Sequence, residues 1–244
     1  MSKLKRQVTN LINSIQFIDL TEAINQPRSE RKAWLRRYVY RRLKKGKFST
    51  YEPFRKSICT IYGVTRGLDP TSPMEWDEFE PWLINSCKGE YVDMNVSAAR
   101  ALYDLVRSPG NKAYDHPAQT LPLGKNRSAV IGLKHYVVRD EEAIFQFPYP
   151  RRSRLNEEDY ELMMSLIHYA YARGDFAAAQ IEVADLSCIA ASPKRKSGEK
   201  ETQPRDPRII RLNPGRLISM HDLAPEVQNV HDLLLEISEE PDPT

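Results

Sequence analysis

The chain has 244 residues, of which 41% are hydrophobic and 28% are charged, and its net charge is +3. This composition excludes wholesale disorder, and the length suffices for one large domain or two small ones. The sequence has no secretory signal and no run approaching the ~20 apolar residues that cross a bilayer, so we expect no membrane association and a cytoplasmic location, or a nuclear one in a eukaryote.

Charge is unevenly distributed along the chain. Residues 1–67 carry 16 Lys/Arg against 4 Asp/Glu, and residues 193–216 carry 8 against 3. Residues 217–244 instead carry 7 acidic residues and no basic one. Such segregation creates local electrostatic potential that the small net charge conceals. The pattern predicts a basic surface built mainly by the first part of the chain.

The N-terminal region, residues 1–108, is expected to be helical and basic. Apolar residues from Leu4 to Ile18 recur at helical spacing, and Gly46 and Gly63 are well suited to end two later helices. Ser72–Glu75 has the form of a capping box with proline at the first helical position. The expected helices cover residues 4–26 before Pro27, residues 29–45, residues 51–62, a segment after Ser72 that Pro81 must kink or split, and a segment capped by Ser97.

The middle region, residues 109–150, combines loop and strand signals. Residues 109–127 are rich in Gly, Pro, Asn and Asp and are expected to form a loop. Residues 128–138 and 143–147 are predicted to be two strands joined by a turn at 139–142. A lone hairpin is only marginally stable in water, so this one must pack on helices.

The C-terminal region, residues 151–244, is again expected to be helical. Asn156 followed by three acidic residues is a strong helix start, and Asp175 could cap a second helix running to Leu186. The run Gln180–Val183 is compatible with a strand, but the turn chemistry and spacing favour helix. Further along, the expected elements are a polar basic loop over 193–216 that contains a short strand at 208–212, and an amphipathic helix from Leu223 to Ile237.

The stretch LIHYAYARGDFAAAQIEVADLSCIAASP, beginning at Leu166, resembles one tetratricopeptide helical hairpin. Gly174, Phe176, Ala179 and the closing Pro193 occupy the expected places, whereas Ile167 replaces the usual small residue. No second copy lies ~34 residues away, and a solenoid needs at least about three stacked units. The resemblance therefore implies a helix–turn–helix shape. The predicted fold class is mainly α: a helical bundle with a small β-hairpin between two helical regions.

The strongest functional signal is the basic helix at 29–45. Arg36, Arg37, Arg41 and Lys44 lie on one face and can follow a phosphate backbone, with binding that weakens as salt rises, whereas Arg42 falls within the apolar arc. A helix-turn-helix DNA-binding motif is excluded, because Pro70 and Pro73 would break its recognition helix. We therefore predict a nucleic-acid-binding accessory or regulatory protein that contacts the backbone of DNA or RNA. The predicted contact residues are Arg36, Arg37, Arg41, Lys44, Lys45, Lys47, Lys194, Arg195 and Lys196.

Other interpretations of the same charges remain open. The basic helix could pack on an acidic surface of this protein or of a partner, which would make the chain a protein–protein adaptor or subunit that also uses the tetratricopeptide-like hairpin. Residues 194–196 also fit a nuclear import signal or a solvated linker. No catalytic motif, glycine-rich phosphate loop or metal-ligand spacing is found, and the three cysteines form no C-x-x-C pair. We therefore expect no enzyme activity, cofactor or metal.

Overall fold

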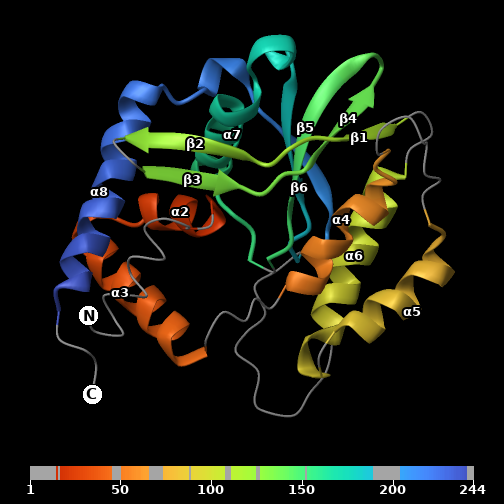
Figure 1. The fold of residues 1–244 in the computed structure, drawn as a ribbon, viewed down its shortest axis with the longest axis horizontal. Coiled ribbons are helices and arrows are strands. Elements are labelled where there is room, and N and C mark those ends of the chain that lie inside the picture. The colour runs from red at the N-terminus through yellow and green to blue at the C-terminus, as the bar shows by residue number, and fades with distance from the viewer. Residues whose placement is uncertain are drawn as a thin grey trace.

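The computed structural model describes residues 15, 17–45, 51–65, 74–87, 89–107, 111–124, 127–151, 153–188 and 204–240. Within these ranges, a twisted sheet lies between two groups of helices (Figure 1). None of the described helices is long and apolar enough to cross a membrane. The helices are α2 (Phe17–Ile24), α3 (Arg28–Lys45), α4 (Glu52–Tyr62), α5 (Trp76–Ser86), α6 (Val92–Val106), α7 (Glu157–Tyr171) and α8 (Met220–Ser238).

The main sheet has five strands in the order β1-β4-β5-β6-β7. Strands β5 and β6 are parallel and the other neighbours are antiparallel. Parallel neighbours need a crossover connection, and α7 provides it. Strands β2 and β3 form a separate two-stranded sheet. The strands are β1 (Lys112–Asp115), β2 (Gln119–Gly124), β3 (Arg127–Ile131), β4 (His135–Arg139), β5 (Glu142–Tyr149), β6 (Gln180–Asp185) and β7 (Arg208–Arg211).

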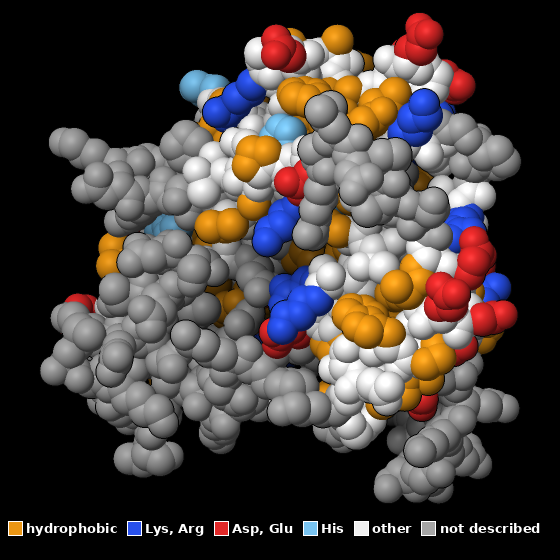
Figure 2. All heavy atoms as spheres, turned by 45° about the vertical axis from the view of Figure 1, so that its right-hand side comes forward, with side chains coloured by type: hydrophobic (Ala, Val, Ile, Leu, Met, Phe, Trp, Pro, Cys, Tyr) orange, Lys and Arg blue, Asp and Glu red, His pale blue; other side chains and the backbone are white. Residues whose placement is uncertain are grey.

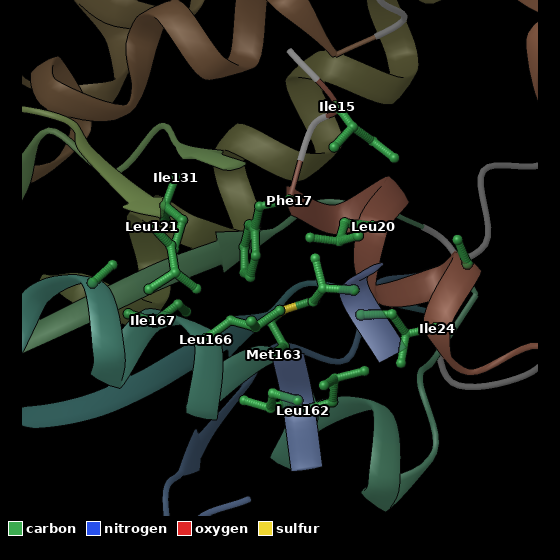
Figure 3. Packing of buried hydrophobic residues seen from close by; sticks show 14 of the residues in the cluster. Ile15, Phe17, Leu20, Ile24, Leu121, Ile131, Leu162, Met163, Leu166 and Ile167 are labelled. Carbon is green, nitrogen blue, oxygen red and sulfur yellow. The ribbon is translucent and has the colours of Figure 1, made fainter. Parts of the chain in front are cut away.

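The larger hydrophobic core lies around α7, which packs on β6 and is covered by α2 and the β2–β3 hairpin. Met163 and Leu166 of α7 point toward Phe17 and Leu20 of α2 (Figure 3). Met163 is fully buried. Each such side chain contributes about 1.5–3 kcal/mol on burial, so this core joins the N-terminal helices to the C-terminal half of the chain.

A second core lies on the opposite face of the sheet, under α4, α5 and α6. Strand β6 contributes to both cores because successive side chains of a strand point to opposite faces. Val183 belongs to the α7 core, whereas Ala184 belongs to the core that contains Phe54 of α4 and Leu102 of α6. The inner strand β6 is therefore buried on both sides.

The predicted fold class is wrong, since a helical bundle with a small hairpin does not describe a five-stranded mixed sheet. The expected loop at 109–127 contains β1 and β2. Strand β1 forms the edge of the main sheet and β2 belongs to a two-stranded sheet, and such positions tolerate turn-forming residues and proline. The expected hairpin is only partly right: its turn forms at Asp140 and Glu141, both at positive φ, between β4 and β5. The single strand expected over 128–138 is instead two, β3 in the two-stranded sheet and β4 in the main sheet.

The tetratricopeptide-like hairpin is also wrong in its second half. A single 3-10 turn at Gly174–Phe176 follows α7, and the chain then enters β6 instead of a helix. Because β6 is buried on both faces, it lacks the polar alternation that marks a half-exposed strand. Its apolar residues therefore satisfied a helical spacing by coincidence.

Two local end signals are confirmed, at the end of α4 and the start of α7, whereas α5 begins after Glu75 and not after Ser72, which lies outside the described residues along with Gly46. Gly63 adopts the left-handed conformation at the end of α4 with φ 59°, and the Asn156 side chain accepts a hydrogen bond from the Asp159 backbone N–H at the start of α7. The first expected helix lies mostly outside the described residues, and its last part, α2, ends before Pro27. Ser97 is not a cap, because it lies inside α6.

Candidate functional site

The helix α3, predicted to grip phosphates, packs beside the acidic helix α8. Arg36 donates from Nε and Nη2 to the two carboxylate oxygens of Glu240, at 2.8 and 2.5 Å. This hydrogen bonding holds the pKa of Glu240 below its usual value. One turn away, Lys32 donates to Glu236 at 2.8 Å. Part of the basic face is thus neutralised by the protein's own carboxylates.

The structure does not gather the other predicted contact residues into one described site. Arg37 and Arg41 are exposed on α3, whereas Arg36 is paired with Glu240. Lys44 and Lys45 belong to the last turn of α3, but their side chains are not described. The remaining predicted contacts, Lys47, Lys194, Arg195 and Lys196, lie outside the described residues.

The described arginines of the basic loop predicted at 193–216 are bound to other groups of the protein. Arg205 donates to the backbone oxygen of Pro150 at 2.9 Å and to Ser97 Oγ at 3.0 Å. Arg208 donates to Asp185 at 3.0 Å, and Arg216 pairs with Glu157 and Glu161 of α7. These contacts tie the segment from 205 to 216 to α6, β6 and α7, so its arginines do not form a free basic arm.

The carboxylate of Glu182 in β6 is the centre of a buried polar network beneath α4. It is fully buried and accepts hydrogen bonds from Arg139 and Arg211, each at 3.0 Å. Gln146 donates to its other oxygen at 2.6 Å and accepts from the Tyr62 hydroxyl at 2.6 Å. Every partner of this acid comes from a different element, so the network ties four segments together.

A pocket of about 670 Å³ lies where α2, α4, the β3–β4 connection and the end of β5 meet. Its apolar wall includes Ile15, Phe17, Ile58, Leu133 and Phe147. The volume falls in the range of small-molecule sites, which are mostly apolar with a few convergent polar groups. This pocket is therefore a candidate ligand site in the described part of the chain.

His135, the first residue of β4, is the buried polar group in the pocket wall. It is 1% exposed, and neither ring nitrogen has a hydrogen-bond partner among the described residues. Its ring lies 4.2 Å from the Tyr62 ring, centroid to centroid. Burial lowers the pKa of His135 to about 3, so the imidazole is neutral at physiological pH. A neutral imidazole offers one donor and one acceptor.

The rim of the pocket carries charge. Lys56 and Lys134 are exposed lining residues, and Arg55 is a third cation in the lining. Glu52 is the acid among the lining residues, and it pairs with Lys56 at 2.9 Å. Elsewhere in the described ranges, no group of three or more His, Cys, Asp or Glu side chains is arranged to hold a metal ion. The pocket therefore combines an apolar interior, a neutral hydrogen-bonding group and a cationic rim.

Sequence reasoning missed this pocket and the role of His135 in it. The five histidines were compared only with metal-ligand spacings, which none of them satisfies. An available signal was the alternation in β4, where His135 and Val137 share one face and both are buried. A histidine on the inward face of a predicted strand indicates a buried imidazole, and buried imidazoles are uncommon.

These features define a mixed α/β protein that has two hydrophobic cores and a ligand-sized pocket where its elements meet. A model of the family described as "Sliding clamp-binding bacterial toxin SocB" matches residues 18–241, which span every described helix and strand except the first residue of α2. The chain belongs to this family. Searches of curated proteins and of solved structures found no match.

The family assignment overturns the prediction of a nucleic-acid-binding regulator. The family is described by its binding of a protein, the sliding clamp, and not by binding DNA or RNA. The alternative, a protein–protein role, agrees better with this description. The surfaces predicted for that protein–protein role were only partly right. The tetratricopeptide-like hairpin does not form, and Arg36 of the basic face is paired with Glu240.

Proposed function

We propose that this chain binds a bacterial sliding clamp and acts as a toxin through that contact. The observation that carries the proposal is the family match, which extends over residues 18–241 of the 244. A match of that length includes both hydrophobic cores and the sheet between them. The proposal also places the chain in the cytoplasm, as its composition predicts.

We propose further that α5 provides an anchor for the clamp. Trp76, Phe79 and Leu83 bury one face of this helix in the second core, while Trp82 stays 46% exposed. No other tryptophan, tyrosine or phenylalanine in the described ranges is classed as exposed. Tryptophan is enriched among the residues that dominate the binding free energy of interfaces.

The surroundings of Trp82 suit a protein surface. Asp77 and Glu78 are exposed on the same helix, so a hydrophobic anchor is bordered by negative charge. Figure 2 shows hydrophobic side chains interspersed with acidic ones in the lower right of the molecule, where α5 and its neighbours lie. An apolar centre with a polar rim is the usual composition of a protein interface.

Titration calorimetry between the purified chain and the sliding clamp of the same bacterium tests the proposal. Saturable binding is expected, and Trp82→Ala should weaken it roughly 30-fold, the effect of a side chain worth about 2 kcal/mol. Leu235→Ala is the matched control, because Leu235 is 42% exposed on α8. Induced expression of the chain should stop bacterial growth, and Trp82→Ala should relieve that arrest.

The outcomes separate the two levels of the proposal. Binding that survives Trp82→Ala unchanged would overturn the anchor but not the clamp contact. Absence of binding at high micromolar protein concentrations, with both proteins folded, would overturn the clamp contact itself.

A further inference from the structure

The pocket beside α4 contains polar atoms whose burial is not compensated. Both nitrogens of His135 lack a hydrogen-bond partner among the described residues, although the residue is 1% exposed. A buried donor or acceptor left without a partner costs about 1–3 kcal/mol. Such groups are hydrogen-bonded as a rule in native proteins, and the pocket that His135 lines is the open space next to this exception.

The topology places this imidazole where a ligand can reach the wall that contains it. His135 and Val137 share one face of β4, and Val137 packs in the small cluster beside Cys59 of α4. Cys59 and His135 both line the pocket, which therefore lies between α4 and the start of β4. A group seated against this wall meets His135, whose neutral imidazole is tilted by 40° against the Tyr62 ring behind it.

The charges at the rim of the pocket indicate which charge the other end of the ligand carries. Lys134 is exposed and directly precedes His135, so the polar wall and a cation are adjacent in the chain. Lys56 and Arg55 approach from α4, where Glu52 offsets part of their charge. An anionic group on the ligand would gain charge-assisted hydrogen bonds there.

We propose that this pocket binds a small amphipathic anion. Its apolar body would contact Phe17, Ile58 and Phe147, a neutral hydrogen-bonding group such as an amine N–H, amide or hydroxyl would face His135, and its anionic group would lie near Lys134. The site is separate from Trp82 of α5, and the proposal does not depend on clamp binding. The small molecule 8-anilinonaphthalene-1-sulfonate combines these three features and serves as the probe.

The first experiment is a fluorescence titration of the folded chain with this probe. Saturable binding with one site per chain is expected. Gly132→Phe should abolish it, because a Cβ at this lining residue meets no heavy atom within 4 Å and the added ring can occupy the pocket. His135→Phe keeps an aromatic ring but removes both nitrogens, and we expect roughly two- to tenfold weaker binding.

The rim is tested with a matched pair of lysines. Lys134→Ala should weaken binding roughly threefold or more, and added salt should reduce this difference. Lys112→Ala is the control, since Lys112 is an exposed lysine on β1 outside the pocket lining. Near-ultraviolet circular dichroism of each variant establishes that packing is native, because this probe also binds loosened proteins.

A second measurement does not depend on any substitution. Cys59 lines the pocket, whereas Cys87 lies after α5 and outside the lining. Saturating probe should slow alkylation of Cys59 by iodoacetamide and leave the rate at Cys87 unchanged, as mass spectrometry of the digested protein would report. The proposal is overturned if the native chain shows no saturable binding, if Gly132→Phe binds as well as the unmodified chain, or if both cysteines respond equally.

Discussion

Replacing Glu182 by alanine removes the acid on which four elements converge. Arg139 and Gln146 would both lose an acceptor in the interior, and the Gln146 amide would keep only its contact with Tyr62. Arg139 is 26% exposed, so water compensates it only in part. We therefore expect a large loss of stability that originates in the uncompensated groups left behind.

The size of that loss follows from burial. Removing one partner of a buried ion pair typically costs about 3–5 kcal/mol. In a protein of this length each kcal/mol lowers Tm by about 2–4 °C, so Glu182→Ala should lower Tm by roughly 6–20 °C. Arg211 contacts the same carboxylate but is 66% exposed. Its replacement by alanine should therefore cost less than about 1 kcal/mol.

Differential scanning calorimetry and urea unfolding of both variants measure this contrast. Glu182→Gln provides an intermediate case, since it keeps the shape and one acceptor but places an N–H₂ group among donors. Equal effects of Glu182→Ala and Arg211→Ala would refute the reasoning, because the two changes would then act without regard to burial.

Three further results are expected. Asn156→Ala removes the acceptor of the Asp159 N–H at 2.7 Å and should cost about 0.5–2 kcal/mol in urea unfolding; no change in the midpoint would argue against a capping role. Burial raises the pKa of Tyr171 to about 12 from an ordinary value of 10, so unfolding free energy should decline as pH rises from 10 to 12, and Tyr171→Phe should flatten that decline. Burial lowers the pKa of His135 to about 3 from 6.5, so stability should be full above pH 6.5 and fall as pH drops toward 3; the same slope in His135→Phe would contradict this assignment.

The parts of the fold that could be predicted are those whose causes are local in sequence. Gly63 ends α4 and Asn156 begins α7 through contacts within a few residues. Strand β6 could not be recognised in the same way, because its identity depends on pairing with β5 and with β7. A strand buried on both faces has no alternation to distinguish it from a short buried helix.

The functional prediction failed for a related reason. The arginines of α3 were visible as a basic face, but the carboxylate that pairs with Arg36 belongs to Glu240, 204 residues later. Acidic segments of the chain were recognised as alternative partners, yet the sequence does not state which helix packs on which. The alternation in β4 could have indicated that His135 is buried, but its place in a pocket depends on α4 and the end of β5, which are distant in sequence.

The central claim is that the chain binds the sliding clamp of its own bacterium. Titration calorimetry of the two purified proteins tests it most directly, with Trp82→Ala and Leu235→Ala measured alongside. We expect saturable binding that Trp82→Ala weakens roughly 30-fold and Leu235→Ala leaves unchanged. No heat of binding and no complex on size-exclusion chromatography, with the folded native chain, would contradict it.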